Sequence, residues 1–174
     1  IRNFRRLVFL IVLVAIFFGA IAPGELTNSE AERLLRSQYP RYLTANIQIN
    51  DFGLSPSVPN ELEYLRSAGM ALYKFIPPGT KGYGCSGNLT PFGEIYLVKN
   101  LGEEFVSMAI AKVELEKITG IREMPEYNRG FVEYVEKVTE ITPVGEMYSD
   151  LKIGVKYGVD ADFTKYNDGW RLEK

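Results

Sequence analysis

Five acidic residues in the last third of the chain have a spacing that could serve metal binding or acid–base catalysis. Asp160 and Asp162 alternate with apolar residues, so both lie on one face of an expected strand. Glu133, Glu136 or Glu140 on a neighbouring strand could complete a Ca²⁺ site or a general acid–base pair. Solubility alone also produces carboxylates at period two on a wet sheet face, and we favour that interpretation. We therefore predict no metal site, no catalytic residue and no cofactor.

The other candidate nucleophile is Cys85, the one cysteine of the chain, within Gly84-Cys85-Ser86-Gly87. Lys81 is the nearest basic residue, so nothing in the local sequence would lower the pKa of the thiol. Histidine is absent from the whole chain, which removes Ser-His-Asp and Cys-His nucleophilic sites and the usual zinc ligand sets. We predict that the chain is not an enzyme.

An apolar N-terminal segment predicts a membrane anchor. Arg2, Arg5 and Arg6 precede sixteen uncharged residues, which are close to the lower limit for a membrane-spanning helix. A cleavable signal peptide would look similar, with Ala20-Ile21-Ala22 as the cleavage site, but Pro23 after that site disfavours cleavage. The predicted anchor consists of Leu7, Val8, Phe9, Leu10, Ile11, Val12, Leu13, Val14, Ala15, Ile16, Phe17, Phe18, Gly19, Ala20, Ile21 and Ala22.

Charge asymmetry around this segment predicts its orientation. The arginines come before it and acidic residues follow it, which favours a cytoplasmic N-terminus. We expect residues 1–24 to anchor the chain, and residues 25–174 to form one extracytoplasmic domain, with a bacterial inner membrane and periplasm as the favoured location. Without the three arginines, 17 basic residues face 22 acidic ones, a net charge of about −5. A surface of that sign argues against nucleic acid as a partner.

Two helices are expected early in the domain. Thr27 followed by Glu30 matches a capping box, and predicts a helix over residues 28–38. Asn60 with Glu63 predicts a second helix, which Gly69 would close in a left-handed conformation.

Strands dominate the remainder of the domain. Residues 104–121 fit either a helix or a long strand, and we favour the strand because several of them are β-branched. Residues 77–93 are rich in glycine and proline and predict a long irregular loop. Asn167-Asp168-Gly169 predicts a hairpin turn before a closing strand at Trp170. Further strands are expected at residues 42–49, 70–76, 94–99, 131–141 and 153–163.

The C-terminal strands carry a resemblance. Residues 131–174, and above all the segment from Phe163 to Leu172 with Asn167-Asp168-Gly169-Trp170, resemble the end of cystatin-like and nuclear-transport-factor-2-like domains. The resemblance implies an α+β fold, with two helices packed on a curved antiparallel sheet behind the N-terminal transmembrane helix. Members of such families include pocket enzymes and non-catalytic assembly modules, so the resemblance does not choose between them.

Two functional classes remain open. The favoured one is a membrane-anchored accessory or assembly subunit of a larger envelope or surface complex, which contacts the lipid bilayer and other protein subunits. The alternative is a membrane-tethered domain that binds or converts a small molecule in a pocket. Aromatic residues supply much of the contact area at protein interfaces, and we expect Tyr83, Phe92 and Tyr148 to contact a partner.

Overall fold

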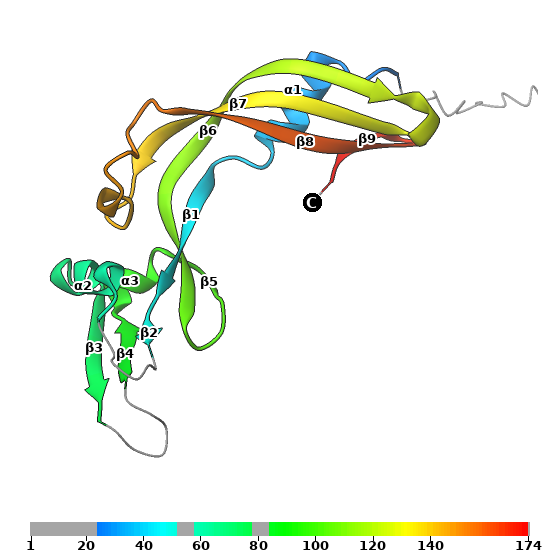
Figure 1. Cartoon of the computed structure of the whole chain (residues 1–174). Coiled ribbons are helices and arrows are strands. Elements are labelled where there is room, and N and C mark those ends of the chain that lie inside the picture. Colours follow the sequence, from blue (N-terminus) through cyan, green and yellow to red (C-terminus); the bar gives the residue numbers. More distant parts are fainter. Residues whose placement is uncertain (1–23, 52–57, 78–83, 174) are drawn as a thin grey trace, which may run out of the picture.

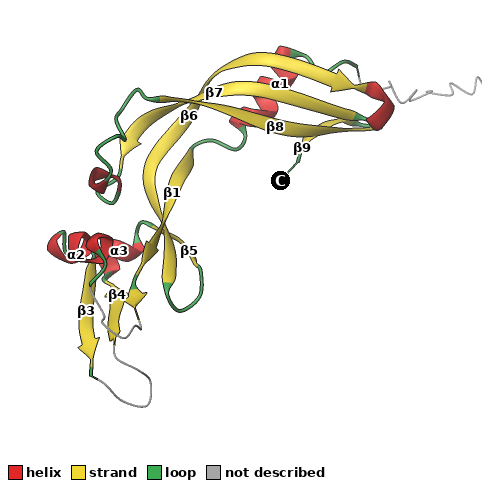
Figure 2. Cartoon of the chain, viewed as in Figure 1, coloured by secondary structure: helices red, strands yellow, loops and turns green. Residues whose placement is uncertain are grey.

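The chain is mostly β-structure. The computed structural model describes residues 24–51, 58–77 and 84–173 (Figure 1). Strands hold 54% of these residues and helices of all kinds 20%, and the strands form two antiparallel sheets (Figure 2). The predicted α+β arrangement of two helices on one curved sheet is therefore wrong. Three α-helices lie in the described ranges, and they are divided between the two sheets.

The larger sheet forms the arch in Figure 1. Its strand order is β1-β6-β7-β8-β9, and β5 also pairs with β6. The first half of β6 pairs with β1, whereas the second half pairs with β7. The strands are β1 Arg41–Gln48, β5 Leu97–Asn100, β6 Phe105–Met124, β7 Arg129–Ile141, β8 Lys156–Tyr166 and β9 Gly169–Leu172.

Bulges in the β6–β7 ladder give the arch its curvature. The register of this pair shifts at three places, and two of the shifts leave Glu116 and Thr119 of β6 without a partner residue. Each unpaired residue bends the strand and increases its twist. After Val113 and up to the end of β6, the edge of this strand that faces away from β7 pairs with no described strand. The two bulges make this edge irregular, and an irregular edge hinders the addition of another strand.

Helix α1 (Asn28–Arg36) packs on the larger sheet. The Thr27 hydroxyl accepts the backbone N–H of Glu30 at 3.2 Å, which confirms the predicted cap. Ala31 and Leu35 are spaced at one turn, and both are buried. They belong to a core cluster with Leu26, Leu115, Val132, Tyr134, Phe163 and Trp170.

A smaller sheet lies at the other end of β1 and β6 (Figure 1). Its strand order is β2 (Asn50–Asp51), β4 (Gly84–Leu89) and β3 (Ala71–Ile76). Helices α2 (Asn60–Ser67) and α3 (Pro91–Glu94) lie beside it. Gly87 of β4 lets the Ile49 backbone and the Leu62 side chain of α2 lie close to this sheet. An added Cβ at this position would lie 2.7 Å from the Ile49 carbonyl oxygen and 2.9 Å from Leu62. The core at this end contains Ile47, Leu62, Leu65, Met70, Ala71, Cys85, Val106, Met108 and Val144.

Two 3₁₀ helices complete the described structure. The first, η1 (Pro125–Tyr127), joins β6 to β7, and Asn128 follows it in the left-handed conformation. The second, η2 (Gly145–Met147), follows β7. The buried Thr142 side chain holds this turn in place: its hydroxyl donates to the Ala109 carbonyl at 2.7 Å and accepts the Gly145 N–H at 3.1 Å.

Several predicted elements need correction. The loop predicted at residues 77–93 contains β4 and α3, while its residues 78–83 lie outside the described ranges. Asn60 is the first residue of α2, and the cap position belongs to Pro59, which makes no side-chain capping bond. The predicted strand over residues 104–121 is confirmed by β6, and the left-handed Gly69 after α2 is confirmed by its φ of +73°.

The predicted single-pass membrane location is also corrected. Within residues 24–51, 58–77 and 84–173, no helix is long and apolar enough to cross a membrane. The predicted anchor, residues 7–22, lies outside the described ranges together with Arg2, Arg5 and Arg6. The structure therefore does not support the transmembrane anchor or the periplasmic placement that depends on it.

Candidate functional site

The five acidic residues singled out from the sequence do not come together. Glu133 lies directly opposite Asp160 in the β7–β8 ladder, and both side chains are exposed. Asp162 is also exposed, whereas Glu136 is completely buried, on the opposite face of β7 from Glu133. Glu140 lies near the far end of β7. In the described part of the chain, no group of three or more His, Cys, Asp or Glu side chains is placed to hold a metal ion.

Glu136 instead forms a buried ion pair that the sequence analysis missed. Arg41 of β1 contacts both carboxylate oxygens: Nη2 lies 2.5 Å from Oε2, and Nε lies 2.5 Å from Oε1. The Tyr39 hydroxyl donates a further hydrogen bond to Oε1. The Glu136 side chain has no exposed surface, while that of Arg41 is 43% exposed. The carboxylate is therefore neutralised from one side and closed off by protein on the others.

Two tyrosines surround this carboxylate and stay protonated. Burial raises the pKa of Tyr39, and the hydrogen bond to Glu136 raises it further. Burial also raises the pKa of Tyr134, and the negative charge of Glu136 adds to that effect. Both phenols therefore stay neutral at ordinary pH, and neither can act as a general base. The arrangement of Arg41, Tyr39 and Glu136 ties β1 to β7 across β6 and acts as a structural link.

Alkaline titration tests this description of the tyrosines. Burial is the first cause of a raised pKa for Tyr39, Tyr64, Tyr134 and Tyr148. The unfolded chain loses these phenolic protons at a lower pH than the folded chain does. The contribution of the protonated tyrosines to the stability of the fold is therefore complete below pH 10, and it is lost as pH rises through their higher pKa values in the folded chain. We expect the phenolate absorbance of the folded chain to rise later than that of the urea-unfolded chain, and the urea midpoint to fall above pH 10. Titration of all eleven tyrosines as one ordinary set would contradict the described packing.

Cys85 is a core residue of β4 and not a loop thiol. Its side chain has no exposed surface, and it packs in the same cluster as Leu62 and Met70. Burial raises the pKa of the thiol, and the nearby Asp51 carboxylate raises it further. The thiolate is the nucleophilic form of cysteine, so this environment opposes reactivity.

The three residues expected to contact a partner have different positions. Tyr83 lies outside the described ranges. Phe92 is on α3, is exposed, and meets Tyr96 edge to face with ring centroids 5.8 Å apart. Tyr148 is half-buried directly after η2 and lines a hollow together with Tyr64 of α2. The structure therefore places Phe92 and Tyr148 at separate features of the surface.

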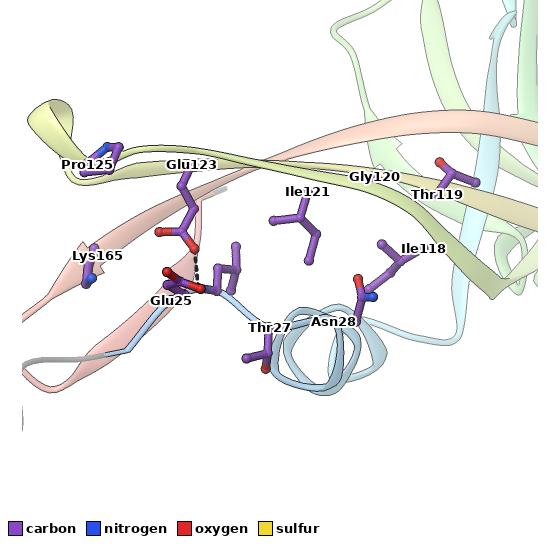
Figure 3. Close-up of a pocket in the computed structure, with 11 residues that line it drawn as sticks. Glu25, Thr27, Asn28, Ile118, Thr119, Gly120, Ile121, Glu123, Pro125 and Lys165 are labelled. Carbon is purple, nitrogen blue, oxygen red and sulfur yellow. Dashed lines mark hydrogen bonds between the residues drawn. The ribbon is translucent and has the colours of Figure 1, made fainter.

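A polar cleft of about 710 Å³ lies between the start of the described chain and the unpaired edge of β6 (Figure 3). The Glu123 carboxylate at its wall accepts the Leu26 backbone N–H at 2.5 Å, so one of its oxygens is already used within the chain. Glu25 and Lys165 supply its other charges. The remaining lining comes from Thr27, Asn28, Ile118, Thr119, Gly120, Ile121 and Pro125.

An apolar groove opens beside β5. It has a volume of about 280 Å³, and Glu140 and Thr142 are the polar residues of its lining besides the tyrosine hydroxyls. Ile95 is 71% exposed, and Val98 and Tyr42 are at least half exposed. We define the apolar groove by its lining, Tyr42, Ile95, Tyr96, Leu97, Val98, Ala109, Glu140 and Thr142. Of the residues in and beside this groove, Phe92 alone was predicted from the sequence to contact a partner. The apolar run Ile95-Tyr96-Leu97-Val98 is a signal in the sequence that could have identified the groove.

No protein-family model, no curated protein and no solved structure matches the chain. The resemblance to cystatin-like and nuclear-transport-factor-2-like domains therefore stays a prediction.

Proposed function

We propose that this chain is a non-catalytic binding module that holds a segment of another protein in the apolar groove. The observation that carries the proposal is the exposure of large apolar side chains around one concave surface. Ile95 contributes to it from the end of α3, Val98 from β5 and Tyr42 from β1. Contiguous apolar surface of this kind is rare on a monomer unless it binds something.

The groove has a rigid base. The Ala109 N–H donates to the Tyr96 carbonyl at 2.8 Å, so the segment that leads into β5 is fixed to β6. Phe92 extends the apolar surface through its edge-to-face contact with Tyr96. A preformed groove loses little entropy on binding, which favours affinity. An extended or helical segment with one large apolar side chain suits this shape.

The candidate catalytic groups support a non-catalytic role. Glu136 is neutralised by Arg41, and the Cys85 thiol is buried with a raised pKa. The sequence has no histidine to activate a hydroxyl or thiol. Binding through exposed apolar side chains needs none of these groups.

Replacing Ile95 by aspartate tests the groove, and Ile153 provides a matched control. Ile153 is 67% exposed, close to the value for Ile95, but it is not part of the groove lining. We expect the full chain isolated from its source under native conditions to migrate with a stoichiometric partner. Ile95→Asp should weaken that complex at least tenfold, because the new carboxylate must lose its water in an apolar contact. The Ile153→Asp variant should keep the complex. Size-exclusion chromatography with mass spectrometry measures how much partner each variant retains.

Two results would overturn this proposal. The full chain could migrate alone at concentrations well above those in the cell. Alternatively, Ile95→Asp and Ile153→Asp could weaken the complex equally, which would place the contact elsewhere.

A second candidate function, the binding of a small molecule, is favoured by the volume of the polar cleft. Pockets for small ligands commonly have this size, and Lys165, Glu25 and Glu123 are all part of its lining (Figure 3). A ligand with both an acidic and a basic group would match these charges. Such a ligand should raise the melting temperature of the unaltered chain, and Lys165→Met should abolish the rise.

A further inference from the structure

A separate hollow of about 350 Å³ lies where α2 meets η2. The hollow combines two tyrosine rings with two carboxylates, and each element supplies one of each. Tyr64 and Glu61 come from α2, whereas Tyr148 and Glu146 come from η2 and the residue after it. Asn60 and Met147 complete its lining.

The two carboxylates and the two rings line the same hollow. Burial raises the pKa of Tyr64, and the charge of Glu146 on the opposite element raises it further. Burial likewise raises the pKa of Tyr148, with a further contribution from Glu61 of α2. Each tyrosine therefore senses the carboxylate of the other element. The four groups converge on one space.

The walls of this hollow are fixed in position. The Tyr64 hydroxyl donates to the Pro143 carbonyl at 3.2 Å, which joins α2 to the segment before η2. Met147 packs against the core cluster that contains Leu62 and Leu65. The hollow is therefore preformed, and a ligand would not have to order it.

The charge of the hollow is uncompensated by the described residues. Neither Glu61 nor Glu146 forms an ion pair within residues 24–51, 58–77 and 84–173, and no lysine or arginine is part of the lining. The N-terminus of α2 contributes about half a positive charge. Two full negative charges exceed it, so the hollow attracts cations.

We propose that this hollow binds a cationic organic group, an ammonium or guanidinium, between the rings of Tyr64 and Tyr148 and beside the carboxylates of Glu61 and Glu146. Aromatic faces attract such cations through their quadrupole, and carboxylates add charge and hydrogen bonding. The cation is either a lysine or arginine side chain of a partner protein or a free amine. This site does not depend on the apolar groove, so either proposal can fail alone.

The test is a titration of the full chain with cationic probes, in which nuclear magnetic resonance monitors the chemical shifts of the backbone amides. The probes are the blocked amino acids N-acetyl-lysine methylamide and N-acetyl-arginine methylamide, and tetramethylammonium. N-acetyl-norleucine methylamide is the uncharged control. We expect saturable shifts confined to residues around Glu61, Tyr64, Glu146 and Tyr148 with a cationic probe, and none with norleucine.

Variants separate specific recognition from general attraction to an acidic protein. The double variant Glu61→Gln/Glu146→Gln should weaken binding at least tenfold, and Tyr148→Leu several-fold with the charge unchanged. Glu103→Gln/Glu104→Gln removes the same charge from two exposed residues outside the hollow, and should leave binding within twofold.

The outcomes decide both the proposal and the source of the cation. Tighter binding of the lysine or arginine probe assigns the site to a protein side chain, and tighter binding of tetramethylammonium assigns it to a small free ammonium ion. Equal losses in the two double variants would overturn the proposal, because binding would then follow net charge alone. Absence of saturable shifts with every cationic probe, or equal shifts with norleucine, would overturn it as well.

Discussion

Replacing Arg41 by glutamine is expected to lower the free energy of unfolding by about 3 kcal/mol. The change leaves the fully buried carboxylate of Glu136 with the Tyr39 hydroxyl as its remaining described partner. Removal of one member of a buried ion pair commonly costs roughly 3 to 5 kcal/mol. The 43% exposure of Arg41 lets water reach the space it vacates, which argues for the lower end of that range. Urea unfolding followed by Trp170 fluorescence measures the loss.

Arg171 provides the matched control for this substitution. Its guanidinium pairs with Asp168 at 2.9 Å, but both side chains are more than half exposed. Exposed pairs contribute at most about 1 kcal/mol, so Arg171→Gln should change stability little. The ion-pair description would be contradicted if Arg171→Gln were as destabilising as Arg41→Gln.

A double substitution separates loss of the pair from burial of an unpaired charge. Glu136→Gln removes the buried charge, so Arg41→Gln should be less harmful in a chain that already carries Glu136→Gln. The coupling between the two changes is the quantity that reports their interaction. Strictly additive losses would mean that Arg41 stabilises the fold through its aliphatic stem and not through Glu136.

The position of Glu136 shows where sequence reasoning succeeded and where it failed. The strand was predicted, and the structure confirms it as β7. Val132, Tyr134, Glu136 and Val138 share one face at period two, and all four are buried. Grouping Glu136 with Glu133 ignored this parity, since residues three apart on a strand point to opposite faces. The signal for a buried carboxylate was present, but its partner Arg41 lies ninety-five residues away, and no local pattern identifies it.

In the smaller sheet, the predicted strand over residues 70–76 is confirmed by β3, but β4 could not be predicted, for a different reason. Strand β4 has the sequence Gly-Cys-Ser-Gly-Asn-Leu, and this composition is typical of a loop. It forms a strand because β3 pairs with it and because Gly87 lets Ile49 and Leu62 approach closely. The hairpin before Trp170, by contrast, followed from its local turn sequence. For β6 the sequence fitted a helix as well, and its β-branched residues favoured the strand that the structure confirms.

Gly145→Ala is the second substitution with a large expected effect, a loss of about 3 kcal/mol or more in the free energy of unfolding. An added methyl group would overlap the Ile110 carbonyl oxygen, and it would lie 2.9 Å from Cγ2 of Ile141. Backbone atoms of β6 cannot move aside as a flexible side chain can, so η2 must shift instead. Gly158→Ala is the control, because a methyl group there meets nothing within 4 Å.

The same substitution connects the core to the cation-binding hollow. Gly145 begins the turn that carries Glu146 and Tyr148, and its N–H is held by the Thr142 hydroxyl, which in turn donates to the Ala109 carbonyl. A shift of η2 would separate these groups from Glu61 and Tyr64. We therefore expect Gly145→Ala to weaken both stability in urea and binding of a cationic probe, whereas Gly158→Ala changes neither. Loss of stability with intact binding would mean that the turn moves as a unit with α2, and that Tyr64 rather than Gly145 fixes the shape of the hollow.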